Sequence, residues 1–138
     1  MTEKLDSETT ISPERRAWLL KKLRFPVIAT IRSDGMPSQS VVWFDLDPDR
    51  DDVVLMNTLA GRVKDKHLRR DPRVSLCFED GTEYLTIEGR AELDDDRERA
   101  WEGILALARR YNGGEDSFAH GPRVTITMRV ERVIWHPR

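Results

Sequence analysis

The stretch FPVIATIRSDGMPSQSVVWF, residues 25–44, sets the expected architecture of this chain. Its first part, residues 25–32, is rich in β-branched and apolar residues and predicts a strand. The Asp34-Gly35 pair that follows supplies the positive backbone dihedrals of a tight hairpin turn. Residues 37–46 then predict the returning strand, so the fold is expected to begin with an antiparallel pair.

More strands are expected after this hairpin. The polar turn at residues 47–52 leads into VVLMN at residues 53–57, which predicts a three-stranded meander. Alternating apolar residues predict a second hairpin and a long closing strand, at residues 74–79, 84–93 and 123–135. Six strands in hairpin connections favour a small antiparallel barrel over a parallel sheet, because parallel crossovers require helices between most strands.

Three short helices complete the expected α+β fold. Ser12 and Pro13 suit the cap and the first position of a helix near the N-terminus. The polar segment 62–70 ends at Asp71-Pro72, as a short helix does. The acidic run at residues 94–96 is suited to capping a longer helix that extends to about residue 111. We therefore expect one domain over residues 1–138, with residues 1–11 as a flexible tail.

Composition excludes several classes of protein. The chain has 138 residues and a formal net charge of -2, which argues against a generic nucleic-acid-binding protein. No apolar run approaches the roughly 20 residues of a membrane-spanning helix, and the polar first dozen residues lack the features of a secretory signal. A cytoplasmic location is therefore expected. One cysteine, Cys77, and three scattered histidines give no metal-ligand spacing, so no metal site is predicted.

Positive charge is concentrated in one segment, GRVKDKHLRRDPR at residues 61–73, where six Lys or Arg residues face only Asp65 and Asp71. The free amides at the start of a helix bind anions, and arginine pairs with phosphate through two hydrogen bonds. Together with Thr58 and Gly61, this segment can form a phosphate cradle. The alternative is a solvated helix face, because Lys and Arg commonly occupy exposed positions without binding a ligand.

No catalytic side chain is predicted. Ser, His and Asp are all present, but nothing resembles a nucleophile elbow or another triad signature. We interpret Cys77 as a small packing residue, because it lies in a predicted strand and no local feature stabilises its thiolate.

The ordered combination of residues 25–44, VVLMNTLAGRVKDKHLRRDPRVSLCFED at residues 53–80 and YLTIEGRAEL at residues 84–93 resembles the pyridoxamine 5'-phosphate oxidase-like flavin and deazaflavin proteins. The form of these motifs is most similar to the F420-dependent reductase branch. The resemblance runs from about Leu20 to Leu93, with a compatible closing strand. It implies a six-stranded antiparallel split β-barrel with short helices, a homodimer that binds FMN or coenzyme F420 in a groove between protomers.

The resemblance also assigns cofactor-binding residues. The family's phosphate-binding turn corresponds to Thr58, Arg62, Val63 and Lys64, and His67 stands where many relatives have Asn. The stretch whose backbone runs along the ring system corresponds to Ser38, Gln39, Ser40 and Val41. In this branch the hairpin at Asp80-Gly81 also approaches the cofactor.

The function that the resemblance implies is an F420H2-dependent reductase, which transfers a hydride from the deazaflavin to an unsaturated small molecule. Positive charge beyond the needs of one phosphate, at Lys66, Arg69, Arg70 and Arg73, favours F420 with its acidic glutamyl tail over FMN. Two alternatives stay open: an FMN-dependent oxidoreductase of the pyridoxamine-phosphate-oxidase type, and a non-catalytic carrier of F420 or a flavin. Vitamin B6 oxidation itself is disfavoured, because the ending at residues 136–138 leaves little room for further basic groups.

Overall fold

The computed structural model describes residues 6–138. This part of the chain forms an α+β fold, as expected from the sequence. Its elements in chain order are β1 (Asp6–Glu8), α1 (Pro13–Leu20), β2 (Val27–Ile31), β3 (Pro37–Val41), β4 (Asp45–Leu46), β5 (Val53–Leu59), α2 (Val63–Arg70), β6 (Arg73–Asp80), β7 (Glu83–Asp94), α3 (Arg97–Arg110), the 3-10 helix η1 (Glu115–Ser117) and β8 (Arg123–His136).

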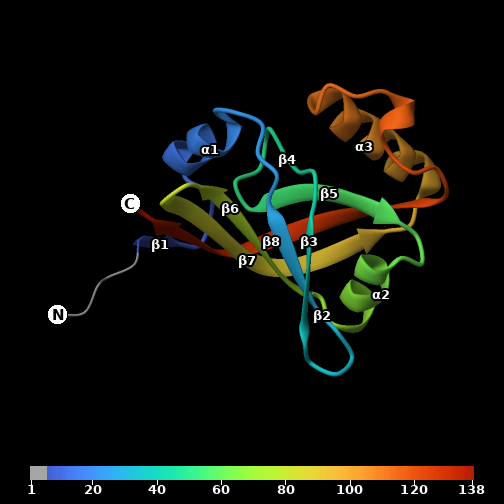
Figure 1. The fold of residues 1–138 in the computed structure, drawn as a ribbon, viewed down its shortest axis with the longest axis horizontal. Helices are drawn as coiled ribbons and strands as arrows, with labels where there is room; N and C mark the ends of the chain where they lie inside the picture. The colour runs from blue at the N-terminus through green and yellow to red at the C-terminus, as the bar shows by residue number, and fades with distance from the viewer. Residues whose placement is uncertain (1–5) are drawn as a thin grey trace.

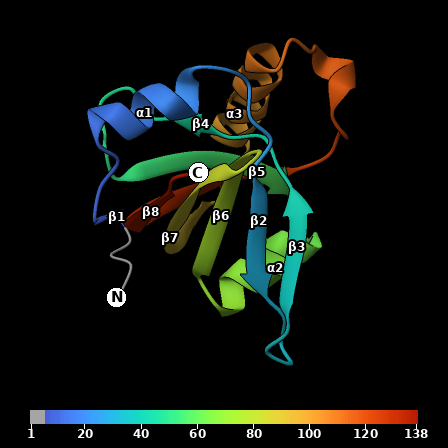
Figure 2. The same cartoon turned by 60° about the vertical axis from the view of Figure 1, so that its left-hand side comes forward.

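All strands belong to one antiparallel sheet with the order β3-β2-β6-β7-β8-β5-β4, and β1 pairs with β8 beside this path. The sheet is strongly curved, with α1 and α3 at the top of both views and α2 below, beside the β2 and β3 hairpin (Figures 1 and 2). The sheet is not closed on itself, as in a split barrel. Residues 6–138 contain eight strands where six were expected, because β1 and β4 are two short additions.

The hairpin expected at residues 25–44 is present. Strands β2 and β3 pair in the register Val27 with Val41 through Ile31 with Pro37. Gly35 makes the turn with a φ of 86°, a backbone conformation that glycine adopts without steric penalty. β3 is an edge strand of the sheet, and the hairpin extends beyond its neighbours (Figure 2).

The expected three-stranded meander is wrong. β3 ends at Val41, and β2 pairs on its other side with β6. β5 instead pairs along its length with β8 and only briefly with β4. The reason lies in Val42, Phe44 and Leu46, which are buried. Because these side chains enter the core, the chain leaves the β3 edge and crosses to the opposite side of the sheet before β5 begins.

Alternation along the strands builds the core as expected. The side chains of Val74, Leu76 and Phe78 on β6 are buried. The core continues through buried apolar residues of β5, β7 and β8 and includes Phe44, whose ring meets the edge of Phe78 at 4.8 Å between centroids. Burial of each large apolar side chain contributes roughly 1.5–3 kcal/mol. This core holds β5 and β8 in place, and these two strands carry part of the site described below.

Of the two predictions for the N-terminal segment, the capped helix is confirmed and the flexible tail is not. Ser12 caps α1 by accepting a hydrogen bond from the Arg15 amide at 3.2 Å, and Pro13 takes the first helical position, as predicted. The expected flexible tail at residues 1–11 differs from the structure over its described part. Residues 6–8 form β1 against β8, and Ile11 is buried with its amide bonded to the carbonyl of Asp51. Residues 1–5 lie outside the described residues.

α3 begins at the acidic run, as expected. Asp96 is its N-cap and accepts a hydrogen bond from the Arg99 amide at 2.9 Å. The helix buries Ala100, Ile104 and Leu107 and packs against β5 and β8. None of the helices within residues 6–138 is long and apolar enough to cross a membrane.

A cationic groove as candidate functional site

A groove of about 390 Å³ opens where β3, β5, α2, α3 and the start of β8 converge. We call it the cationic groove. The strand ends contribute Val41, Val42, Trp43, Asn57, Thr58 and Leu59. The helices, the η1 loop and β8 contribute Arg62, Val63, Lys64, Ile104, Leu107, Ser117, Phe118, Ala119 and Arg123.

All charged side chains that line the groove are positive. Its lining contains Arg62, Lys64 and Arg123 but no Asp or Glu, although the chain has 25 acidic residues. Burial lowers the pKa of the Lys64 ammonium, and the nearby cations Arg62 and Arg123 lower it further. Burial, followed by the charge of Arg62, likewise lowers the pKa of Arg123. Three neighbouring cations without a carboxylate favour the binding of an anion.

Arg123 is the most informative of these cations, because only 7% of it is exposed. Its Nη2 donates to the carbonyl of Ala119 at 2.7 Å, and its Nη1 donates to Asn57 Oδ1 at 3.4 Å. Its Nε has no hydrogen-bond partner among the described residues. A buried charge that has only neutral partners is unfavourable, so an anion in the groove would supply the interaction that Arg123 lacks.

The first turn of α2 adds backbone donors to the groove. Gly61 adopts a φ of 79°, and its amide donates to Asp65 Oδ2 at 2.7 Å. Arg62 is the N-cap in an extended conformation and makes no side-chain capping bond. The amides of the first turn therefore keep their donors for a ligand, at the positive end of the helix dipole. Lys64 Nζ reaches Ser40 Oγ at 3.3 Å, which connects α2 to β3.

The other part of the groove is apolar and aromatic. The Trp43 ring stacks on Tyr111 with centroids 5.1 Å apart. Tyr111 is fixed by its hydroxyl, which donates to the Arg24 carbonyl at 2.5 Å and accepts from the Phe44 amide at 3.3 Å. Phe118 contributes a second ring to the lining, and the Arg123 guanidinium lies 5.3 Å from its centroid. A ligand with a flat ring next to an anionic group fits this arrangement.

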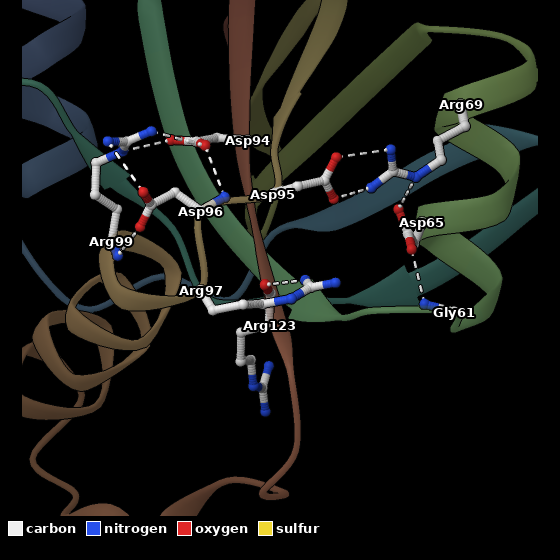
Figure 3. Close-up of polar contacts among 9 residues, drawn as sticks. All are labelled: Gly61, Asp65, Arg69, Asp94, Asp95, Asp96, Arg97, Arg99 and Arg123. Atoms are coloured by element: carbon white, nitrogen blue, oxygen red, sulfur yellow. Dashed lines mark hydrogen bonds and ion pairs between the residues drawn. The ribbon is translucent and has the colours of Figure 1, made fainter.

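Of the four basic residues of the segment that do not line the groove, Arg69 and Arg73 form ion pairs. Arg69 bridges Asp65 and Asp95, with its Nε 2.7 Å from Asp65 Oδ1 and its Nη2 2.5 Å from Asp95 Oδ1 (Figure 3). Arg73 pairs with Asp71 at 2.8 Å.

Arg70 donates to the carbonyl of Ile31, and Lys66 is exposed outside the lining of the groove. Of the surplus charge that favours an acidic tail, that of Arg69 and Arg73 is therefore paired within the protein, whereas Arg70 donates to a neutral carbonyl and Lys66 is exposed. Only the front of the segment faces the groove.

A hydrogen bond beside these ion pairs connects α3 to β8 at the groove. At the start of α3, Arg97 donates to the carbonyl of Arg123 at 2.8 Å, close to the pairs made by Asp95 (Figure 3). In this view the Arg123 side chain points away from the pairs between Asp65, Arg69 and Asp95. The carbonyl of Arg123 is thus held by Arg97 at the start of α3, and its guanidinium lies apart from these ion pairs.

A second cavity, of about 500 Å³, lies against the same helix but has the opposite charge. The acidic side chains in its lining are Asp45, Asp94, Glu98 and Glu102, and its one basic residue is Arg99. Arg99 is itself paired with Asp94 and Asp96. Because carboxylates repel a phosphate, the cationic groove is the better candidate for an anionic ligand.

The structure brings together most of the residues assigned from the sequence. Thr58, Arg62, Val63, Lys64 and Val41 line the groove, and Ser40 contacts Lys64. Ser38 and Gln39 are absent from the lining and pair with Thr30 and Ala29 along β2. His67 also lies outside the lining, with its Nδ1 2.9 Å from Thr30 Oγ1.

Ten of the fifteen residues that line the groove were not predicted from the sequence, among them Trp43, Asn57, Phe118 and Arg123. Asn57 carried a usable signal, because an amide is unusual in an apolar strand such as VVLMNTL. Arg123 carried none, since an arginine at the start of a strand is ordinary.

The cysteine and the possible metal ligands of the described residues give no further candidate site. Burial, with a smaller effect of Glu79, raises the pKa of the half-buried Cys77 thiol, which opposes the reactive thiolate form. No group of three His, Cys, Asp or Glu side chains within residues 6–138 is arranged to hold a metal ion.

Comparison with known proteins identifies a family. Residues 11–136 match the family model described as pyridoxamine 5'-phosphate oxidase. The chain is 27% identical over 130 residues to the F420H(2)-dependent biliverdin reductase of Mycobacterium tuberculosis (strain CDC 1551 / Oshkosh), an alignment that covers 94% of this chain and 91% of that protein.

Solved structures agree with this result. A protein described as an F420 reductase superposes with a TM-score of 0.71 at 27% identity, covering 88% of this chain and 98% of that one. A conserved hypothetical protein from Mycobacterium tuberculosis gives a TM-score of 0.75 at 25% identity, with 96% and 89% of the two chains covered.

Proposed function

Because the chain belongs to the pyridoxamine 5'-phosphate oxidase family and is similar over most of its length to F420-dependent reductases, we propose that it is an F420H2-dependent reductase. In this proposal it transfers a hydride to an unsaturated small molecule. The observation that carries the proposal is the cationic groove, which combines three cations, free helix amides and no carboxylate.

The residues of the groove suggest how the chain would hold F420. Arg62 and Lys64 are placed to bind the phosphate together with the amides of the first turn of α2. Arg123 adds a third positive charge to the lining from its buried position. Trp43 and Phe118 would flank a flat ring and exclude water from it, because both are large aromatic groups in the lining.

The reactive group in this proposal belongs to the cofactor. Reduced F420 supplies the hydride when it is bound. The protein needs no nucleophile of its own, and its contribution is to fix the ring, to keep solvent away and to leave room for the acceptor. This division of work agrees with a lining that contains no His, Cys, Asp or Glu side chain.

FMN is the second candidate cofactor, because the matched family is described by a flavin-dependent oxidase. FMN also carries a phosphate, and the same three cations suit it. Similarity to two F420-dependent proteins favours F420. The charge of Arg69 and Arg73 does not support that choice, because these side chains are ion-paired within the protein.

We also propose a homodimer. Four large apolar side chains are unusually exposed, with values of 58% for Phe25, 57% for Met36, 63% for Val41 and 57% for Val63. Val41 and Val63 also line the groove. A second copy of the chain over these residues would cover apolar surface and close the groove. Sedimentation at micromolar concentration should give the mass of a dimer, and a monomer would remove this model.

A single-turnover experiment tests the reductase against a non-catalytic carrier. The protein is loaded with F420H2 and mixed with a panel of enones, quinones and tetrapyrroles, while the absorbance of oxidised F420 is followed. A reductase shows oxidation that depends on the identity of the acceptor and is faster than oxidation of free F420H2. If no acceptor changes the rate for the bound cofactor, the protein is a carrier and the proposed activity is wrong.

A further inference from the structure

Asn57 occupies an unusual position on β5. The strand reads VVLMNTL, and Asn57 is its only polar residue before Thr58. Asparagine is disfavoured in strands, because its side chain competes for backbone hydrogen bonds and packs poorly against apolar neighbours. A residue that opposes the local preference in this way is often retained for a specific contact.

The two ends of the Asn57 carboxamide have different partners. Nδ2 donates to the carbonyl of Ala100 on α3 at 2.9 Å. Oδ1 accepts from Arg123 Nη1 at 3.4 Å. α3 passes close by, since a Cβ built on Gly103 would lie 3.4 Å from Asn57 Nδ2. Asn57 thus lies between α3 and the buried guanidinium of Arg123.

The partners of Arg123 determine how much of its charge reaches the groove. Both of its hydrogen-bond acceptors, Asn57 Oδ1 and the Ala119 carbonyl, are uncharged. A carboxylate in place of the Asn57 amide would have nearly the same shape and would form an ion pair with Arg123. The charge of Arg123 would then be neutralised within the protein, as that of Arg69 is by Asp65 and Asp95.

We propose that Asn57 is a positioning residue that aims the Arg123 guanidinium into the cationic groove and, because it is uncharged, leaves the positive charge of Arg123 to the ligand. This inference rests on the proposed function, in which the groove holds the phosphate of F420. Asn57 would then determine the selectivity of the groove for an anion without contacting the anion itself.

Three variants separate the charge of Asn57 from its shape. Asn57→Asp keeps the size of the side chain and adds a negative charge. Asn57→Ser shortens the side chain and stays neutral. Asn112→Asp is the matched control, because it makes the same chemical change at an exposed residue after α3 that does not line the groove. Thermal unfolding and the far-ultraviolet spectrum establish which variants are folded.

The readout is the affinity for F420 compared with that for its deazaflavin core, which lacks the phosphate and the glutamyl tail. We expect Asn57→Asp to weaken F420 binding by about 30-fold or more, because the introduced carboxylate pairs with Arg123 and neutralises the charge that would otherwise face the phosphate. We expect Asn57→Ser to weaken it by about 3- to 10-fold, as for loss of a neutral hydrogen bond. Affinity for the core should stay unchanged in both variants.

Two results would overturn the inference. One is an F420 affinity in Asn57→Asp equal to that of the Asn112→Asp control. The other is an equal loss of affinity for F420 and for the core, which would mean that Asn57 only attaches α3 to the sheet. If Asn57→Asp does not fold, Asn57→Ser decides between these outcomes by the same comparison.

A phosphate titration tests the role of Asn57 without any cofactor. If the wild-type protein binds neither F420 nor FMN, the proposed function fails, and inorganic phosphate becomes the probe. The Nε–H resonance of Arg123 is then followed by NMR during a phosphate titration. The inference predicts a shift in the wild-type protein that is lost in Asn57→Asp. It is contradicted if the wild-type resonance does not move, or if the variant responds equally.

Discussion

The basic segment of residues 62–73 has two ends that behave differently. At the front, Arg62 and Lys64 line the groove, where no carboxylate is present. At the back, Arg69 is held by Asp65 and Asp95, and Arg73 is held by Asp71. The same residue types are therefore a binding surface at one end and structural ion pairs at the other. The position of the acidic partners makes this difference.

Helix geometry explains why the acidic residues serve the back of the segment. Asp65 and Arg69 are four residues apart and meet on one face of α2. The other oxygen of Asp65 accepts from the Gly61 amide, so the carboxylate is engaged on both sides. Arg62 and Lys64 lie on the groove side of the first turn, where the other charged side chain of the lining is the cation Arg123. The four predictions that follow test this contrast.

Arg123→Met should have the largest effect. It removes the buried cation and leaves a side chain of similar length, and we expect F420 affinity to fall by about 100-fold or more. The ligand-free protein should be equally or more stable, because an incompletely satisfied buried charge is removed. Fluorescence titration and thermal unfolding measure the two effects. An unchanged dissociation constant would show that Arg123 does not face the ligand.

Lys64→Ala compared with Lys66→Ala tests the front of the segment directly. We expect Lys64→Ala to weaken F420 binding by roughly 1.5–3 kcal/mol, since a charge-assisted hydrogen bond to phosphate is lost. Lys66→Ala removes the same charge two residues away, from an exposed side chain outside the lining. Its affinity should stay close to that of the wild-type protein. Equal losses in the two variants would indicate a diffuse electrostatic effect in place of a defined site.

The pH dependence of binding should show a smaller effect. The pKa of Lys64 lies below its ordinary value of 10.5, because burial and the neighbouring cations disfavour the charged form. As the pH rises, Lys64 loses its proton before an ordinary lysine would, and affinity for an anion falls. The ligand-free protein should gain stability over the same interval, because its folded state binds fewer protons than the unfolded state.

Lys64→Arg is the control for this behaviour, because arginine stays charged over this range. Its affinity should fall less steeply between neutral pH and pH 10 than that of the wild-type protein. If the two proteins give parallel curves in a titration of F420 binding against pH, Lys64 is not the titrating group.

Arg73→Gln should have the smallest effect on binding, below about two-fold, because exposed ion pairs contribute little and Arg73 faces away from the groove. Its effect should appear in acid. The hydrogen bond from Arg73 lowers the pKa of Asp71 from 3.8 to about 2. The stability that this pair contributes is present above pH 3.8 and is lost as the pH falls toward 2.

We therefore expect acid unfolding of Arg73→Gln to begin at a higher pH than that of the wild-type protein, as measured by circular dichroism. An unchanged acid transition would mean that the pair makes no contribution. A large loss of F420 affinity would remove the distinction between the two ends of the segment.

Local patterns in the sequence predicted the local elements well. The hairpin of residues 25–44 follows from Asp34-Gly35, and the starts of α1 and α3 follow from Ser12 and Asp96, which cap as expected. Pairing between distant strands was not predictable in the same way. β5 pairs with β8 and not with the preceding long strand, and nothing in the local pattern of VVLMN encodes a partner about 70 residues away.

The residues of the groove show the same difference between local and distant contacts. Thr58, Arg62, Val63 and Lys64 are close together in the sequence, and their spacing with the family resemblance was sufficient to bring them into one prediction. Arg123 reaches the groove only because β8 lies beside β5. The engagement of Arg69 by Asp95 also depends on contact between segments that are far apart in the chain. Charge in a sequence therefore overestimates charge in a site until its partners are known.

In the proposed function the cationic groove binds F420, with Arg62, Lys64 and Arg123 as its anion-binding residues. The most direct test is a parallel equilibrium titration of the wild-type protein with F420 and with FMN, at the same pH and ionic strength. We expect F420 to bind more tightly than FMN. Tight binding of FMN without binding of F420 would contradict this expectation.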